Sequence, residues 1–329
     1  MGSAAVAGLS YINAKTAFWY DWLMIRSVVP TRLQMWSRER NDRINAFYLL
    51  ESYAKDKATA DVVFLKFEGR SHTYAQTYDS VLHYGAWLRK AHGVKPKDIV
   101  AMDFENSDTF VFLWFGIWSI GAKPAFINFN LSGSVLTHCV KAADASLLLV
   151  DPNVAGNVTD DVRKELESVN IVVLTPELER EVQATEPVRA PDADRSEDLP
   201  HNMSILIFTS GTTGMPKPAI MSWAKAILGA GFASRWLGWK PGDIFYTVRI
   251  TLPLRLSPFS APTLPTLKYH LGHRIDIVRR PCLSITAQLP CWAFFRPWKP
   301  ARLLPSAGSS RPPDSGKRSE PMMLPSSST

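Results

Sequence analysis

The stretch that decides the fold is ILIFTSGTTGMPKPAIMSW, from Ile205 to Trp223. An apolar run typical of a buried strand leads into six small residues, Thr209 to Gly214, each of which is a glycine or an alcohol. Glycines let the backbone turn tightly and direct its N–H groups into one concavity, which is a shape that binds anions. The hydroxyl groups add short donors, and Lys217 adds a positive charge on a slim stem. The stretch therefore predicts a phosphate-binding loop behind a strand.

The predicted phosphate-binding residues are Thr209, Ser210, Gly211, Thr212, Thr213, Gly214 and Lys217. The pattern differs from the GxxxxGK[ST] loop, because the lysine follows Met-Pro and no serine or threonine comes after it. A lone cluster of such residues would indicate only a flexible polar turn. The complete TSGTTG-x-PK pattern behind a strand favours phosphate binding.

Upstream of this stretch, predicted strands alternate with predicted helices. Apolar runs predict the strands, and apolar residues at helical spacing predict the helices. The expected strands are residues 61–67, 98–104, 123–130, 146–151, 170–175 and 204–208, and the expected helices are residues 45–57, 73–94, 107–122, 132–144 and 159–169. Continuously apolar strands in this alternation indicate an α/β fold, with a parallel sheet covered on both faces. Residues 176–200 are charged and poor in apolar side chains, so we expect an exposed loop there.

Charge and cysteine content narrow the class of protein. The net charge is +7, but residues 249–329 carry 12 Lys/Arg and 3 Asp/Glu, whereas residues 1–248 carry 25 and 27. The positive charge therefore belongs to the end of the chain, and we expect no nucleic-acid partner for the folded part. Three cysteines without a CxxC pair, and seven histidines without ligand spacing, predict no zinc site and no other metal site.

The first 44 residues are expected to be helical. The aromatic cluster Phe18-Trp19-Tyr20 with Trp22 lies beside charged residues, which fits either an interfacial membrane helix or a helix packed on the domain. The most apolar run, Phe110 to Ala122, is too short to span a bilayer and predicts a buried helix instead.

Several polar residues elsewhere have weaker claims to a function. Asp103 and Glu105 end a predicted strand, where carboxylates are more often solvated than catalytic. His138 and Cys139 lie in a predicted helix and are expected to pack. The tetrapeptide NFNL, Asn128 to Leu131, is explained equally well by a turn and by a family pattern.

The glycine-rich stretch and the apolar run from Phe110 resemble those of a known family. The stretch IFTSGTTGMPKPAI is similar to the AMP-binding signature of acyl-adenylate-forming enzymes. More narrowly, FVFLWFGIWSIGAKPAFINFNL and PKPAIMSW resemble very-long-chain acyl-CoA synthetases, the fatty acid transport protein family, in its fungal branch. The resemblance runs from about Tyr11 to Thr247.

This resemblance implies a fold and a reaction. The chain would hold part of the large N-terminal domain of the adenylate-forming fold, in which helices cover parallel-rich sheets. ATP with Mg²⁺ would activate a long or very long-chain fatty acid as acyl-AMP, and coenzyme A would then displace AMP, coupled to fatty acid uptake. Residues 209–214 and Lys217 would hold the β- and γ-phosphates. The family is membrane-associated at the cytosolic face of the endoplasmic reticulum, peroxisome, lipid droplet or plasma membrane, which favours a membrane role for residues 1–44.

The resemblance fails near the end of the chain. Thirteen of the 24 prolines follow Arg249, helical and strand periodicity vanish, and the last residues resemble a disordered polar tail. We expect three parts: an N-terminal segment, 1–44; an incomplete AMP-binding domain, 45–248; and a non-family tail, 249–329. The family's magnesium, ribose and catalytic residues belong to later segments, so no catalytic residue is assigned.

A change of reading frame would explain this tail. In one shifted frame, the stretches from Pro281 and from Ser306 can encode segments that resemble the missing family segments, in the right order. Val248-Arg249 can be encoded as an intron start. We therefore hypothesise an unspliced intron followed by out-of-frame translation, and a transcript that matches the protein through codon 329 would refute this. The chain as written is expected to be inactive. The alternatives are an adenylating ligase for another carboxylic acid and a non-catalytic membrane carrier of fatty acids.

Overall fold

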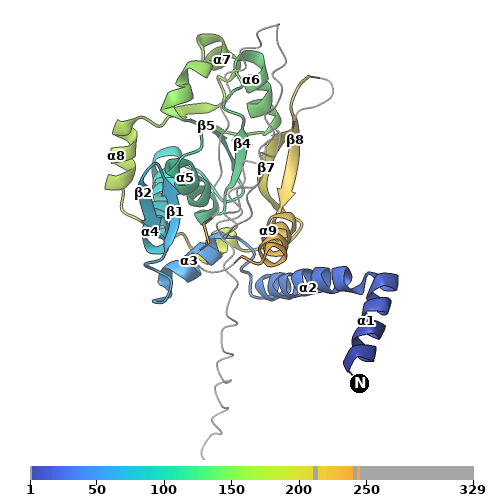
Figure 1. The fold of residues 1–329 in the computed structure, drawn as a ribbon. Coiled ribbons are helices and arrows are strands. Elements are labelled where there is room, and N and C mark those ends of the chain that lie inside the picture. The colour runs from blue at the N-terminus through green and yellow to red at the C-terminus, as the bar shows by residue number, and fades with distance from the viewer. Residues whose placement is uncertain (1, 210–213, 240–242, 245–329) are drawn as a thin grey trace, which may run out of the picture.

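The computed structural model describes residues 2–209, 214–239 and 243–244, and six strands within them form one sheet. The strand order is β6-β5-β3-β4-β7-β8, and every neighbouring pair is parallel except β7 with β8. The strands are β3 (Ile99–Asp103), β4 (Lys123–Ile127), β5 (Leu147–Val150), β6 (Asn170–Val173), β7 (Met203–Thr209) and β8 (Lys217–Ser222). The predicted α/β fold with a parallel-rich sheet is confirmed (Figure 1). The predicted irregular tail, 249–329, lies outside the described residues.

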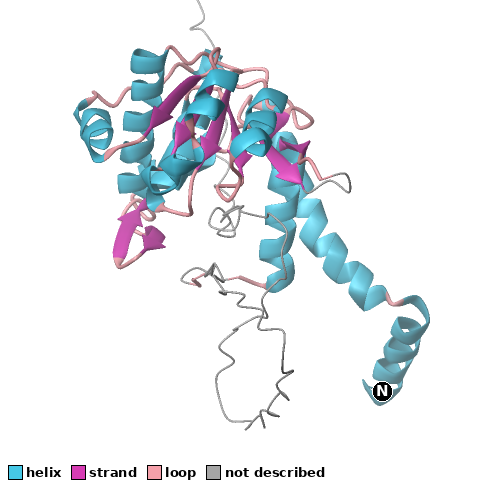
Figure 2. Ribbon diagram, turned by 90° about the horizontal axis from the view of Figure 1, so that it is seen from above, coloured by secondary structure: helices cyan, strands magenta, loops and turns pink. Residues whose placement is uncertain are grey.

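Helices cover both faces of this sheet, and each face has its own apolar core. The helices on one face are α3 (Phe47–Lys55), α4 (Tyr74–His92), α5 (Asp108–Ser119), α8 (Pro176–Ala184) and α9 (Trp223–Leu237). On the other face lie α6 (Gly133–Ala142) and α7 (Asp160–Glu165). The layers are visible from two directions (Figures 1 and 2). Because both faces are covered, the strands need apolar residues at consecutive positions, as the sequence has them.

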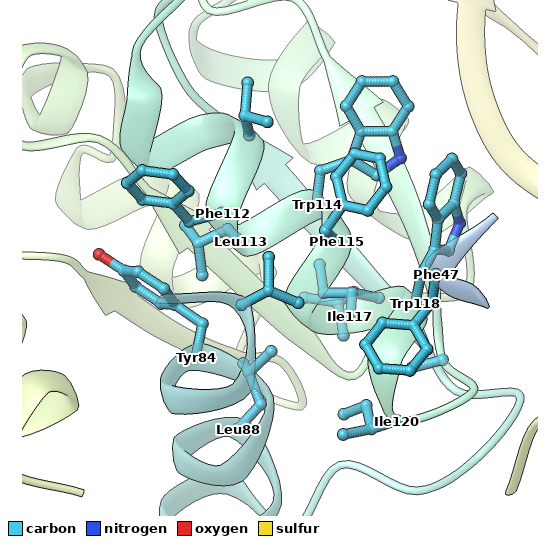
Figure 3. Close-up of a cluster of buried hydrophobic side chains, with 14 of the residues drawn as sticks. Phe47, Tyr84, Leu88, Phe112, Leu113, Trp114, Phe115, Ile117, Trp118 and Ile120 are labelled. Atoms are coloured by element: carbon cyan, nitrogen blue, oxygen red, sulfur yellow. The ribbon is translucent and has the colours of Figure 1, made fainter. Parts of the chain in front are cut away.

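The helix α5 is buried nearly all round, as its apolar sequence predicted. Trp114, Phe115 and Trp118 pack against one another with ring centroids 4.9–5.4 Å apart (Figure 3). Burying such a side chain stabilises the fold by roughly 1.5–3 kcal/mol. Ser107 caps the helix, since its hydroxyl oxygen accepts a hydrogen bond from the Phe110 N–H at 3.0 Å.

The helices α4 and α5 approach each other at two glycines. A Cβ on Gly85 would lie 2.3 Å from the Ser119 Oγ, and a Cβ on Gly116 would lie 2.9 Å from the Tyr84 Cβ. Only residues without a side chain allow the two backbones to come this close. The α4 helix ends at its C-cap Gly93, whose φ of +64° is the left-handed conformation that glycine adopts readily.

A short hairpin, β1 (Val63–Phe67) with β2 (Arg70–Thr73), stands beside these helices. Its second strand is joined to the start of α5 through the buried carboxylate of Asp108, which lies 3.0 Å from the Arg70 guanidinium and 2.9 Å from the His72 imidazole. The hairpin is thereby fixed to the main body by polar contacts as well as by packing.

The N-terminal segment forms two helices, α1 (Gly2–Thr16) and α2 (Phe18–Arg40), which extend away from the sheet (Figure 1). The α2 helix packs on α9, where the buried Thr31 lies against Gly231 and accepts a hydrogen bond from Arg235 at 2.5 Å. Most of the remaining apolar side chains on α1 and α2 are exposed. Among the described helices, none combines the length and the apolar character needed to cross a membrane.

The prediction of an exposed loop at residues 176–200 is wrong in part, because the segment is largely exposed or half-buried but contains helices. Within this segment the chain forms α8 and then the short 3₁₀ helix η2 (Asp192–Arg195). Another 3₁₀ helix, η1 (Pro152–Asn157), lies earlier in the chain, after β5. The Arg195 side chain is fully buried, donates to the Ala190 carbonyl at 3.0 Å and lies 4.6 Å from the centre of the Phe47 ring. Arg189 pairs with Glu51 of α3 at 2.5 Å. Ion pairs and cation–π contacts thus hold a segment that has too few apolar residues to bury itself.

Candidate functional site

The glycine-rich stretch connects β7 to β8 at the carboxyl edge of the sheet. Thr209 ends β7 and Lys217 begins β8, and the two are cross-strand partners in the antiparallel pair. The Thr209 hydroxyl also donates to the Lys217 carbonyl at 3.4 Å. Because β3, β4 and β5 run parallel to β7, their carboxyl ends lie at the same edge. In open α/β sheets this is the edge at which ligands bind.

The described part of the connection has a buried and an exposed side. Gly214 has a φ of +90°, a conformation that L side chains rarely adopt, so a glycine is needed there. Pro216 is buried, whereas the next residue, Lys217, is exposed. The structure therefore presents the lysine to solvent on a fixed strand end. The other predicted phosphate-binding residues, Ser210, Gly211, Thr212 and Thr213, lie outside the described residues.

His138 is the residue that sequence reasoning undervalued. It was expected to pack, but its Nε2 lies 3.0 Å from the Pro216 carbonyl oxygen, directly before Lys217. Its neighbour Cys139 is buried, as expected. No local pattern in the sequence shows that this histidine meets a carbonyl 78 residues away.

Asp103 is also misplaced by the sequence prediction, since its carboxylate is not solvated but fully buried. Neither carboxylate oxygen has a hydrogen-bond partner among the described residues. Asp151, at the end of the neighbouring strand β5, is also buried. Burial, and after it the negative charge of Asp151, raises the pKa of the Asp103 carboxyl to about 7, while the nearby Asn157 amide opposes the rise.

The tetrapeptide after β4 forms a turn. The Asn128 side-chain oxygen accepts hydrogen bonds from the Asn130 backbone N–H at 3.1 Å and from the Asn130 side chain at 2.9 Å. The Leu131 N–H donates to the Asn128 carbonyl at 2.9 Å. This is the turn geometry that asparagine favours after a strand.

The described part of the carboxyl edge has no cluster of three candidate metal ligands. Among residues 2–209, 214–239 and 243–244, no three His, Cys, Asp or Glu side chains gather in a way that could hold an ion.

A family model described as "AMP-binding enzyme" matches residues 51–253. The match contains the strands β3 to β8 and the whole glycine-rich stretch.

Proteins with similar sequences include fatty acid transport proteins. The very long-chain fatty acid transport protein of Saccharomyces cerevisiae is 32% identical over 201 residues, which are 56% of this chain and 28% of that protein. The very long-chain fatty acid transport protein of Cochliobolus heterostrophus is 28% identical over 75% of this chain and 39% of that protein. A medium/long-chain fatty-acid–CoA ligase of Mycobacterium tuberculosis is 30% identical over 57% of this chain and 31% of its own length. The chain thus spans between 28% and 39% of these relatives.

Solved structures share the fold. The o-succinylbenzoate CoA synthetase of Bacillus subtilis, in complex with an acyl-adenylate intermediate, superposes with a TM-score of 0.50 at 21% identity, over 59% of this chain and 37% of that one. The crystal structure of VinN also gives a TM-score of 0.50 at 21% identity, over 59% of this chain and 47% of that one. Because the family model matches more than half of its residues, the chain belongs to the AMP-binding enzyme family.

Proposed function

We propose that this chain carries the polyphosphate-binding part of a ligase that activates long or very long-chain fatty acids with ATP. The observation that supports it is the TSGTTG-x-PK stretch at the carboxyl end of β7, inside the family match. The names of the similar proteins support a fatty acid as the substrate. The proposed reaction forms acyl-CoA through an acyl-adenylate and is coupled to fatty acid uptake.

The residues at this edge suit the first step of that reaction. A carboxylate oxygen of the acid attacks the α-phosphorus of ATP, the bond from that phosphorus to the bridging oxygen breaks, and pyrophosphate leaves with both electrons. Negative charge accumulates on the leaving group, so donors placed around the β- and γ-phosphates stabilise the transition state. Lys217 and the N–H groups of residues 209–214 are the proposed donors. In the second step the thiolate of coenzyme A attacks the acyl carbon and AMP leaves.

Mg²⁺ enters this proposal only as the ion bound to ATP. The described residues offer no carboxylate set that would hold it. When bound, the ion would neutralise phosphate charge, and the side chains named above would add to that effect.

Lys217→Ala tests the proposed grip on phosphate. We expect the purified 329-residue chain to bind ATP, and the variant to bind it roughly 10- to 100-fold more weakly, because a hydrogen bond to a charged group contributes about 1.5–3 kcal/mol. Isothermal titration calorimetry measures the ATP affinity of the wild type and of the variant. Lys66→Ala, which removes an exposed lysine from the β1 strand, is the control and should leave binding unchanged. Equal affinity of the wild type and Lys217→Ala would contradict the proposal.

We also propose that the N-terminal helices lie on a lipid membrane, at its cytosolic face. Trp19 and Tyr20 on α2 are 68% and 71% exposed, and Phe18 and Trp22 are exposed beside them. Residues 2–40 carry five basic and two acidic side chains, which favours contact with anionic headgroups. Aromatic side chains with a polar edge suit the interface between lipid and water.

Flotation with vesicles of phosphatidylcholine and phosphatidylserine tests the membrane proposal. The wild type should float with the vesicles, and the double variant Trp19→Ser/Trp22→Ser should stay in the dense fraction, because each buried indole contributes apolar area. Val188→Ser, which removes an exposed apolar residue outside α1 and α2, should float like the wild type. Flotation of the double variant at the wild-type level would count against these helices as the contact.

Two alternatives have different signatures. An adenylating ligase for another carboxylic acid would exchange labelled pyrophosphate into ATP with that acid and not with a fatty acid. A non-catalytic membrane carrier would bind fatty acid without exchange. For the chain as written we propose little or no turnover, because residues 254–329 fall outside the family match and resemble none of the later family segments. Formation of oleoyl-CoA by the purified chain from ATP, oleate and coenzyme A would overturn that part.

A further inference from the structure

The polar contact between α6 and the base of the glycine-rich stretch is not explained by packing alone. The His138 Nε2 lies 3.0 Å from the Pro216 carbonyl oxygen. Since a carbonyl only accepts hydrogen bonds, this nitrogen must carry a proton and donate it. Seventy-eight residues separate the two partners in the sequence, so the contact joins two distant elements of the fold.

The donor, His138, lies on a helix that is packed against the core. The residues flanking His138 on α6, Thr137 and Cys139, are buried, as are Leu136 and Val140. A packed core therefore holds the backbone of this helix, and the His138 side chain is itself half-buried. The helix therefore holds the imidazole within hydrogen-bond distance of the strand end.

The acceptor belongs to the peptide group that leads into Lys217. That group is planar, so a hydrogen bond to its carbonyl oxygen also fixes the orientation of the Lys217 N–H and Cα. On the other side, Lys217 is paired across the antiparallel strands with Thr209. The backbone of Lys217 is thus held from α6 and from β7, while its side chain stays exposed.

We propose that His138 is a positioning residue, which acts through Lys217 to place its ammonium group for the phosphates of ATP. This inference rests on the proposed function, because it concerns the same phosphate site. It makes a narrower claim about chemistry: loss of the His138 donor should weaken binding of the polyphosphate and not of the nucleoside. A merely structural histidine would affect neither ligand selectively.

The experiment compares binding of inorganic tripolyphosphate, ATP and adenosine to the full 329-residue chain by calorimetry. His138→Phe keeps a ring and removes the donor, and His138→Gln keeps an N–H donor at a similar reach. We expect about 3- to 10-fold weaker tripolyphosphate and ATP binding for His138→Phe, since one hydrogen bond contributes about 0.5–1.5 kcal/mol. His138→Gln should restore most of the affinity. His201→Ala, an exposed histidine before the opposite end of β7, is the matched control.

A double-mutant cycle tests whether His138 acts through Lys217. If it does, His138→Phe in the Lys217→Ala background should cost little further tripolyphosphate affinity, so the two effects are not additive. Wild-type affinity for His138→Phe, no rescue by His138→Gln, or additive effects would each overturn the inference while leaving the phosphate site intact. A wild-type chain that binds neither tripolyphosphate nor ATP would overturn the proposed function as well. Thermal unfolding of each variant shows that the fold is kept.

Discussion

Replacing Asp198 with alanine should lower the free energy of unfolding by about 3–5 kcal/mol, because it leaves a buried ammonium group without its partner. The Lys123 Nζ lies 2.7 and 2.9 Å from the two Asp198 oxygens, and the side chains are 7% and 10% exposed. Burial lowers the pKa of the Lys123 ammonium, and the Asp198 carboxylate opposes that shift. The ammonium also lies 5.1 Å from the centre of the Trp223 ring. Urea unfolding followed by tryptophan fluorescence measures the loss.

The neighbouring pair gives a matched control. Lys97 and Glu197 lie 3.5 Å apart with side chains that are 73% and 80% exposed. Glu197→Gln should therefore change stability by less than about 1 kcal/mol. The double variant Lys123→Met/Asp198→Leu should lose less than Asp198→Ala, because it removes both buried charges. Asp198→Ala with wild-type stability would show that solvent reaches the pair.

Asp103→Asn should make the protein more stable at alkaline pH and barely change it at pH 4. The buried Asp103 carboxyl has a pKa of about 7 in the folded chain against an ordinary value of 3.8. Between these values the folded chain holds a proton that the unfolded chain releases, so this group's contribution to stability is complete below pH 4 and is lost as pH rises through 7. The difference of about three pH units corresponds to up to about 4 kcal/mol.

The measurement is the free energy of unfolding of the wild type and Asp103→Asn at pH 4, 6 and 8.5. The gain from the substitution should grow between pH 4 and 7 and then level off. Asp61→Asn, at an exposed carboxylate, should show no such pH dependence. A gain that is equal at all three pH values would mean that Asp103 is ionised throughout.

Much of the fold could be predicted from the sequence, because its strands are apolar over consecutive positions and its helices have regular spacing. The strand at residues 146–151 and the helix at residues 107–122 are examples, since both are dominated by buried residues. The segment 176–200 was missed because composition outweighed its helix signals, the capping Thr175 and Pro176 in the first turn. Its fixing contacts, such as Arg195 on Phe47, join residues far apart and leave no local pattern.

The candidate site was predictable in type but not in its surroundings. Glycines, alcohols and a lysine after a strand indicate phosphate chemistry wherever they occur. That Lys217 pairs with Thr209 depends on the register of β7 with β8, and that His138 reaches Pro216 depends on how α6 packs beside this pair. The burial of Asp103 likewise depends on the helices that cover both faces, and a carboxylate at a strand end gives no sign of that.

The close contacts of Gly85 and Gly116 between α4 and α5 limit which substitutions the two helices can accept. Gly85 lies against Ser119 and Gly116 lies against Tyr84, so the two helices are in close contact at both glycines. A methyl group added at either glycine would overlap with the opposite helix. An alanine at Gly116 would meet the Tyr84 Cβ and would need a compensating shift or change on α4. The two helices are therefore expected to co-evolve as one block, with paired substitutions at this crossing.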